Sequence, residues 1–148
     1  MKKQALKVVS MLSLSVMLAV VAVYAKPISP LRANIPFDFT AGNKTLPAGA
    51  YTMDPMTMQG VLRIRRQDCR AAAFVITYGA EARRGQGQSK LVFRRYGDQY
   101  FLAEVWTAND SDGRELRQSR TERELVKSRS NRLAGNAVKP ELVYVIAE

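Results

Sequence analysis

The chain has 148 residues, with 23 Lys and Arg against 13 Asp and Glu, a single Cys and no His. This length fits one domain, and the lone Cys69 excludes an intrachain disulfide framework. The absence of His removes the residue that most often serves as a general base or a metal ligand. No nucleophile motif or zinc-ligand spacing is present, so we expect no catalytic, metal or cofactor site and class the chain as a non-enzyme.

The first 25 residues have the layout of a secretory signal peptide. Lys2, Lys3 and Lys7 are followed by an uncharged run from residue 8 to 25, and Lys26 comes next. We predict that residues 1–25 are removed and that the protein is exported to the periplasm or the extracellular space. The mature chain then has 20 basic and 13 acidic residues and no transmembrane segment. The alternative is a retained membrane anchor, because the run approaches the ~18 apolar residues that suggest a spanning helix.

After the predicted cleavage point we expect an extended leader, residues 26–33, and then one β domain, residues 34–148. Apolar and polar residues alternate from Asn34 to Phe39, which predicts a half-buried strand. Pro36 cannot donate to a strand ladder, so this strand is expected at an edge or at the start of a sheet.

Turn residues then separate this strand from the next one. Gly42-Asn43 and Pro47-Ala48-Gly49 supply the turn chemistry, and a new strand begins at Tyr51. A binding loop at Asn43–Thr45 is the alternative interpretation. The segment concentrates neither charge nor acid–base pairs, which favours a scaffolding role.

The rest of the chain reads mainly as strands. The clearest element is Lys90–Trp106, in which two runs rich in aromatic and β-branched residues flank Tyr96–Gln99 and predict a β-hairpin. Both faces of this hairpin carry apolar residues, so its second face could cover the helix, a partner or a ligand. Further strands are predicted at Val61–Arg66, Ala71–Tyr78 and Leu142–Ile146, and Asn109–Gly113 is expected to end the run of sheet strands that precedes the helix.

One helix is predicted near residues 119–131. Ser119 and Glu122 form a capping box, in which Ser119 accepts from the Glu122 N–H and the Glu122 side chain reaches back. Leu125 and Val126 give the helix only a thin apolar stripe, which indicates a surface position.

The predicted fold is therefore mainly β: a small antiparallel β-sandwich or barrel of about seven strands with one peripheral C-terminal helix. Sandwich and barrel remain open at this point. The expected core is Phe37, Phe39, Tyr51, Leu62, Ile64, Phe74, Ile76, Leu91, Phe93, Phe101, Val105 and Tyr144.

Two groups of side chains are candidates for binding. Arginines lie near aromatic residues on two predicted strands and could bind an anionic surface, or could simply solvate the sheet. This candidate set is Arg63, Arg65, Arg66, Arg94 and Arg95. Met53, Met56 and Met58 offer thioethers that suit Cu(I), but without His we interpret them as core fillers. Gly85-Gln86-Gly87 lacks the third glycine of a phosphate-binding loop and is interpreted as a flexible loop.

Three stretches resemble a family of small exported proteins of soil bacteria whose function is uncharacterised. They are IPFDFTAGNKTLPAGAYTM, LVFRRYGDQYFLAEVW and GRELRQSRTEREL, and together they span about Asn34 to Val126. The resemblance implies export and supplies no functional residues. Arg117 stands where the family pattern has a proline. The LPAGAY segment is also similar to the PxGxY strand starts of extracellular β-sandwich modules, which implies packing roles for Gly49 and Tyr51.

Two functions follow from these features. The first is a non-catalytic binding or structural module of the cell envelope that contacts an anionic polymer or lipid through a basic face. The second is a carrier of a small apolar ligand inside a barrel. Export argues against nucleic acid as a partner. The oligomeric state is left open.

Overall fold

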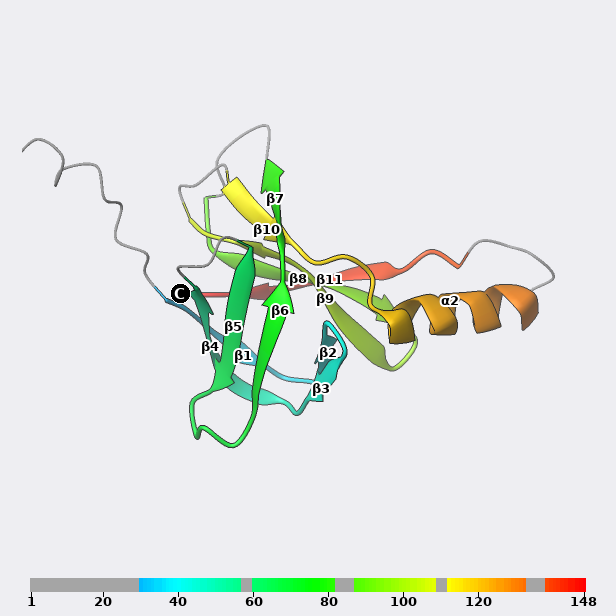
Figure 1. Cartoon of the computed structure of the whole chain (residues 1–148), viewed down its shortest axis with the longest axis horizontal. Helices are drawn as coiled ribbons and strands as arrows, with labels where there is room; N and C mark the ends of the chain where they lie inside the picture. Colours follow the sequence, from blue (N-terminus) through cyan, green and yellow to red (C-terminus); the bar gives the residue numbers. More distant parts are fainter. Residues whose placement is uncertain (1–29, 57–59, 82–86, 109–111, 133–137) are drawn as a thin grey trace, which may run out of the picture.

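The computed structural model describes residues 30–56, 60–81, 87–108, 112–132 and 138–148 (Figure 1). The predicted signal peptide lies outside the described residues, as do Met58 and Gly85-Gln86. The described part of the chain is mainly β, with two sheets and one C-terminal helix, so the predicted fold class is confirmed.

The first sheet has four strands, all antiparallel to their neighbours. Its strand order is β1-β4-β5-β6, so β1 and β6 form its two edges. The strands are β1 (Leu31–Ile35), β4 (Gly49–Pro55), β5 (Val61–Arg66) and β6 (Ala72–Ile76).

The second sheet is built around the predicted hairpin and has the order β11-β8-β9-β10-β7. Its strands are β7 (Tyr78–Glu81), β8 (Lys90–Tyr96), β9 (Gln99–Trp106), β10 (Asp112–Glu115) and β11 (Glu141–Ile146). A short hairpin, β2 (Phe39–Ala41) and β3 (Lys44–Leu46), joins β9 through one parallel pair, Thr40 with Phe101.

The two sheets meet at both margins. At one margin the chain passes from β6 directly into β7, and Thr77 between them donates its N–H to the Gly60 carbonyl over 2.6 Å. At the other margin Arg32 and Glu148 exchange two backbone hydrogen bonds of 2.7 and 2.8 Å. The strands nevertheless form two sheets rather than a closed barrel, which decides between the two predicted architectures.

The core fills the space between the sheets. Phe39 is central, because its ring meets Tyr51 at 5.2 Å and Phe93 at 5.5 Å between centroids, both edge to face. Such pairs add about 0.5–1.5 kcal/mol beyond the burial of apolar area. Most of the expected core is confirmed as buried, namely Phe39, Tyr51, Leu62, Ile64, Leu91, Phe93, Phe101 and Val105, and Phe37 packs against it partly buried.

Three residues of the expected core are exposed instead. Phe74, Ile76 and Tyr144 have 66, 71 and 56 % of their surface accessible. The smaller side chains of Ala73 and Val75 in β6, and of Thr77 directly after it, face inward. The β2–β3 turn passes so close that a Cβ on Gly42 would lie 3.2 Å from a Val75 methyl, which leaves no room there for a larger ring.

The strand boundaries also differ from the prediction. β1 begins at Leu31, so part of the expected leader belongs to the first sheet. Pro36 separates β1 from β2, where one strand was expected from Asn34 to Phe39. The expected end of the sheet run at Asn109–Gly113 was wrong, because β10 begins at Asp112 and continues the second sheet. These divisions bring the described strands to eleven, against about seven predicted.

The helix α2 (Arg120–Arg132) lies at the periphery, as predicted, and extends away from the sheets (Figure 1). Ser119 caps it, since the Glu122 N–H donates to Ser119 Oγ over 3.1 Å. The second half of the predicted capping box was wrong. The Glu122 carboxylate turns toward the second sheet and accepts from Arg94.

Candidate binding groove

The five predicted arginines do not form one surface. Arg63, Arg65 and Arg66 lie on β5 in the first sheet, whereas Arg94 and Arg95 lie on β8 in the second. A single polymer chain crossing a single basic face would not meet all five.

Most of these arginines have carboxylate partners. Nitrogen–oxygen distances are 2.8 Å from Arg63 to Asp54, 3.5 Å from Arg66 to Asp68 and 3.2 Å from Arg95 to Glu141. Exposed pairs of this kind contribute at most about 1 kcal/mol of stability, but each one offsets a positive charge. Arg65 is exposed, and no carboxylate of the described residues lies within 4.0 Å of it.

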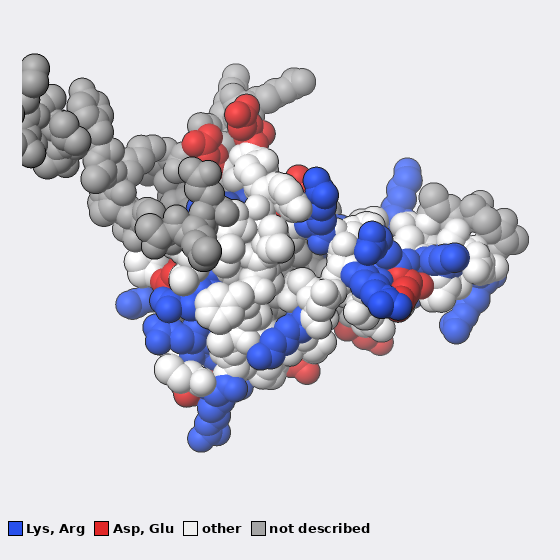
Figure 2. All heavy atoms as spheres, in the orientation of Figure 1, with Lys and Arg blue, Asp and Glu red and all other residues white. Residues whose placement is uncertain are grey.

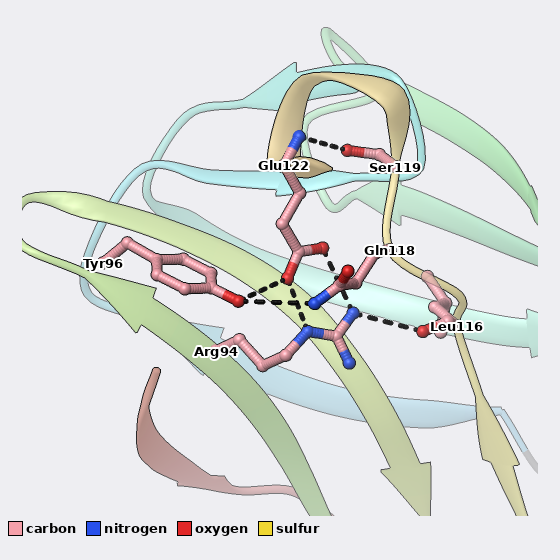
Figure 3. Close-up of polar contacts among 6 residues, drawn as sticks. All are labelled: Arg94, Tyr96, Leu116, Gln118, Ser119 and Glu122. Atoms are coloured by element: carbon pink, nitrogen blue, oxygen red, sulfur yellow. Dashed lines mark hydrogen bonds and ion pairs between the residues drawn. The ribbon is translucent and has the colours of Figure 1, made fainter. Parts of the chain in front are cut away.

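Arg94 has a structural role in the fold (Figure 3). Its Nε donates to Glu122 Oε1 over 2.6 Å, and its Nη2 donates to Glu122 Oε2 and to the Leu116 carbonyl, each over 3.2 Å. Glu122 is 1 % exposed and the Arg94 side chain 13 %. A paired, hydrogen-bonded charge at this depth is stable only while both partners are present. Arg94 therefore fastens α2 to β8 and is not available to a ligand.

Tyr96 completes this cluster. Its hydroxyl donates to Glu122 Oε1 over 3.2 Å, and Gln118 Nε2 donates to the Tyr96 hydroxyl over 3.5 Å (Figure 3). Burial raises the pKa of Tyr96 above its ordinary value of 10, and the neighbouring Glu122 charge raises that pKa further. The cluster thus joins β8 to the first turn of α2 through polar contacts that are mutually satisfied.

A surface groove of about 520 Å³ lies between the edge of β6, the β2–β3 turn and the start of α2. This volume falls within the range of ligand-binding clefts, roughly 300–1,000 Å³. We call it the β6 groove. Its lining residues are Ala41–Lys44, Ala73–Ile76, Tyr78, Arg117–Arg120 and Arg123.

One wall of the β6 groove is apolar and exposed. Phe74 and Ile76 project from β6, and Tyr78 follows on β7 with 43 % of its surface accessible. The Arg117 guanidinium lies over the Tyr78 ring at 4.1 Å from the centroid, a cation–π contact. Clustered exposed side chains of this size commonly mark an interaction site.

The opposite wall is cationic. It carries Lys44, Arg117, Arg120 and Arg123, and no acidic residue lines the groove. Arg120 pairs with Glu124 over 2.9 Å, while the other three have no carboxylate of the described chain within 4.0 Å. Figure 2 shows the uncharged surface in the centre of the view with Lys and Arg side chains on both sides of it. The groove therefore offers apolar contact and net positive charge together.

The backbone of β6 adds a third property. At the two ends of the β5–β6 ladder, the Thr77 N–H donates to the Gly60 carbonyl and the Arg66 N–H donates to the Ala71 carbonyl. The backbone N–H and C=O groups of the odd-numbered residues of β6 therefore point toward β5. Because antiparallel hydrogen-bonded pairs alternate, the N–H and C=O groups of Ala72, Phe74 and Ile76 point to the free edge. No hydrogen bond within the described residues uses these six groups.

Sequence reasoning missed this site for identifiable reasons. Lys44 lies in the segment that was assigned a scaffolding role, and Arg117, Arg120 and Arg123 were not among the five candidate arginines. The useful signal was the alternation that places Phe74, Ile76 and Tyr78 on one face of the strand, but Phe74 and Ile76 were attributed to the core. Only the fold shows that this alternating face is outward and that the other segments lie opposite it.

Other candidate chemistry finds no support within the described residues. Met53 is buried in the core, as its interpretation as a filler predicts. No group of three or more His, Cys, Asp or Glu side chains that could hold a metal ion occurs in the described part of the chain. In that same part, no helix combines the length and apolar character that a membrane crossing requires.

Comparisons with known proteins returned no match among family models, curated proteins or solved structures.

Proposed function

We propose that this protein is an exported, non-catalytic binding module of the cell envelope that holds an anionic polymer in the β6 groove. The observation that carries the proposal is the pairing of an exposed apolar strand with cations that lack carboxylate partners in the described chain. The groove replaces most of the five predicted arginines as the binding surface, because four of those five are already paired within the protein.

The physical basis is electrostatic attraction combined with apolar contact. Charges on exposed side chains are screened over about 8–10 Å at ordinary ionic strength, so association through them falls as salt increases. Contact with Phe74 and Ile76 buries apolar area and contributes a part of the binding that salt does not screen. A carrier of a small apolar ligand is the second function that the sequence suggests. The exposed apolar strand of the β6 groove, and its cations without carboxylate partners in the described chain, favour the anionic-polymer function over it.

The test is co-sedimentation of the full-length chain with the envelope fraction of the producing cell across a salt series. We expect strong binding at low salt that weakens steeply as salt rises. Lys44→Gln, Arg117→Gln and Arg123→Gln together are expected to lower the bound fraction at least tenfold at low salt.

A matched variant controls for net charge. Arg32, Arg132 and Lys139 are exposed and lie outside the groove lining, so their replacement by Gln removes three charges elsewhere. This control should bind within about threefold of the wild type. If both triple variants lose binding equally, the effect comes from the overall charge of the protein and not from the groove. If the wild type does not bind at any salt concentration, the proposal is wrong.

A further inference from the structure

We infer that the occupant of the β6 groove is an extended acidic polypeptide segment, which adds to β6 as a fifth strand of the first sheet. This inference rests on the proposed function and narrows it from anionic polymers in general to one chemical class.

The free edge of β6 is the first argument. Ala72, Phe74 and Ile76 present alternating N–H and C=O groups along the groove, spaced as a strand ladder requires. An extended peptide satisfies such an edge with its own backbone, as in strand addition to other exposed sheet edges. A polysaccharide or a lipid headgroup can neutralise the cations but has no matching backbone ladder.

The composition of β6 is the second argument. Exposed edge strands are normally protected from pairing by charged residues, by proline or by a bulge. The sequence of β6, Ala-Ala-Phe-Val-Ile, contains no charged residue and no proline, and its register with β5 is regular. The edge therefore lacks the usual devices that prevent a further strand from joining it.

Charge is the third argument, and it indicates which side chains the bound peptide carries. Lys44, Arg117 and Arg123 face the strand across the groove and attract carboxylates, whereas Phe74 and Ile76 favour apolar side chains. Side chains of a strand alternate between its two faces, so a segment that alternates acidic and apolar residues supplies both contacts. β6 has five residues, and a segment of about five to seven residues spans it at roughly 3.3 Å per residue.

The test uses a labelled seven-residue peptide that alternates Glu and Val, titrated with the purified full-length protein and followed by fluorescence anisotropy. Two derivatives carry N-methyl groups, one on the odd-numbered and the other on the even-numbered backbone nitrogens. Only one of these sets can face β6 in an added strand. We expect one derivative to bind at least tenfold more weakly and the other to stay within about threefold of the parent.

A pair of protein variants gives a second readout. Phe74→Pro and Phe74→Ala both remove the aromatic ring, but only proline removes the N–H that points to the free edge. Proline is tolerated on an edge strand when its nitrogen faces away from the ladder. We expect the proline variant to bind the parent peptide several-fold more weakly than the alanine variant. If the proline variant does not fold, the two methylated peptides still decide the question with the wild-type protein.

The outcomes separate the inference from the proposed function. A sulfated polysaccharide and vesicles containing phosphatidylglycerol serve as anionic probes without a peptide backbone. If they bind through Lys44, Arg117 and Arg123 while both methylated peptides bind like the parent, the strand-addition inference is overturned and the proposed function stands. If no anionic probe binds at low salt, both fail.

Discussion

At the scale of single residues, a side chain of a neighbouring strand determines that position 113 is a glycine. Gly113 on β10 lies opposite Trp106 on β9, and a Cβ at this position would overlap the Trp106 ring. The ring cannot easily give way, because its Nε1–H donates to Glu104 over 2.6 Å. The glycine is therefore a packing requirement inside a strand, although in the sequence it resembles part of a turn.

We predict that Gly113→Ala lowers the free energy of unfolding by roughly 1–3 kcal/mol, as overpacking typically does. Denaturant titration measures the change. Gly79→Ala is the matched control, since Gly79 lies on the adjacent strand β7 and a Cβ there would meet nothing within 4 Å. The control should be neutral or slightly stabilising. Equal destabilisation by both substitutions would contradict the packing explanation.

At the scale of elements, α2 is held to the body by a polar contact rather than by an apolar face. Leu125 and Val126 are only partly buried, whereas Glu122 is the one buried residue of the helix. Its carboxylate binds Arg94 and Tyr96 on β8. This arrangement also positions Arg117, just before the helix, and Arg120, at its start, which both belong to the cationic wall of the β6 groove.

We predict that Glu122→Ala lowers the free energy of unfolding by roughly 3–5 kcal/mol, because Arg94 would keep its charge in a nearly buried position without a carboxylate partner. Glu124→Ala, two residues along the same helix, removes only an exposed pair with Arg120 and should cost no more than about 0.5 kcal/mol. Chemical denaturation of the two variants provides the comparison. Similar costs for both would mean that the buried pair does not fasten the helix.

The sequence predicted elements with strong local signals and missed those that depend on tertiary context. The Lys90–Trp106 hairpin and the helix start at Ser119 follow from turn and cap residues, and the structure places both where they were expected. The outward face of β6 could not be predicted, because both of its faces are apolar. The groove joins β2–β3, β6 and the start of α2, so its cations could not be grouped before the fold was known.

At the scale of the whole molecule, two buried phenols make the stability of the fold depend on pH. Tyr51 is fully buried and donates its hydroxyl to the Pro47 carbonyl over 2.6 Å, which agrees with the packing role that the PxGxY likeness implies. Burial raises the pKa values of Tyr51 and Tyr96 above 10. The unfolded chain therefore releases these protons first as the pH increases, and the folded state loses stability in that range.

We predict that these two tyrosines cause no change of the free energy of unfolding with pH well below pH 10. Above pH 10, they cause this free energy to fall as the pH rises. Tyr96→Phe should reduce the steepness of this fall, although it also removes a hydrogen bond to Glu122 and so lowers stability at neutral pH. Urea titrations at a series of pH values measure both effects. Tyr144→Phe, at an exposed ring, is the matched control, and an unchanged slope in Tyr96→Phe would refute the assignment.

The hydrogen bonds between Arg32 and Glu148 have a consequence for how the protein can be tethered. They bring the first strand of the fold and the last residue of the chain to one corner, at the margin of the first sheet that lies across β4 and β5 from β6. A solid support or a neighbouring molecule that is attached at Glu148 is therefore attached at this corner. The β6 groove lies at the opposite edge of the first sheet from this attachment point.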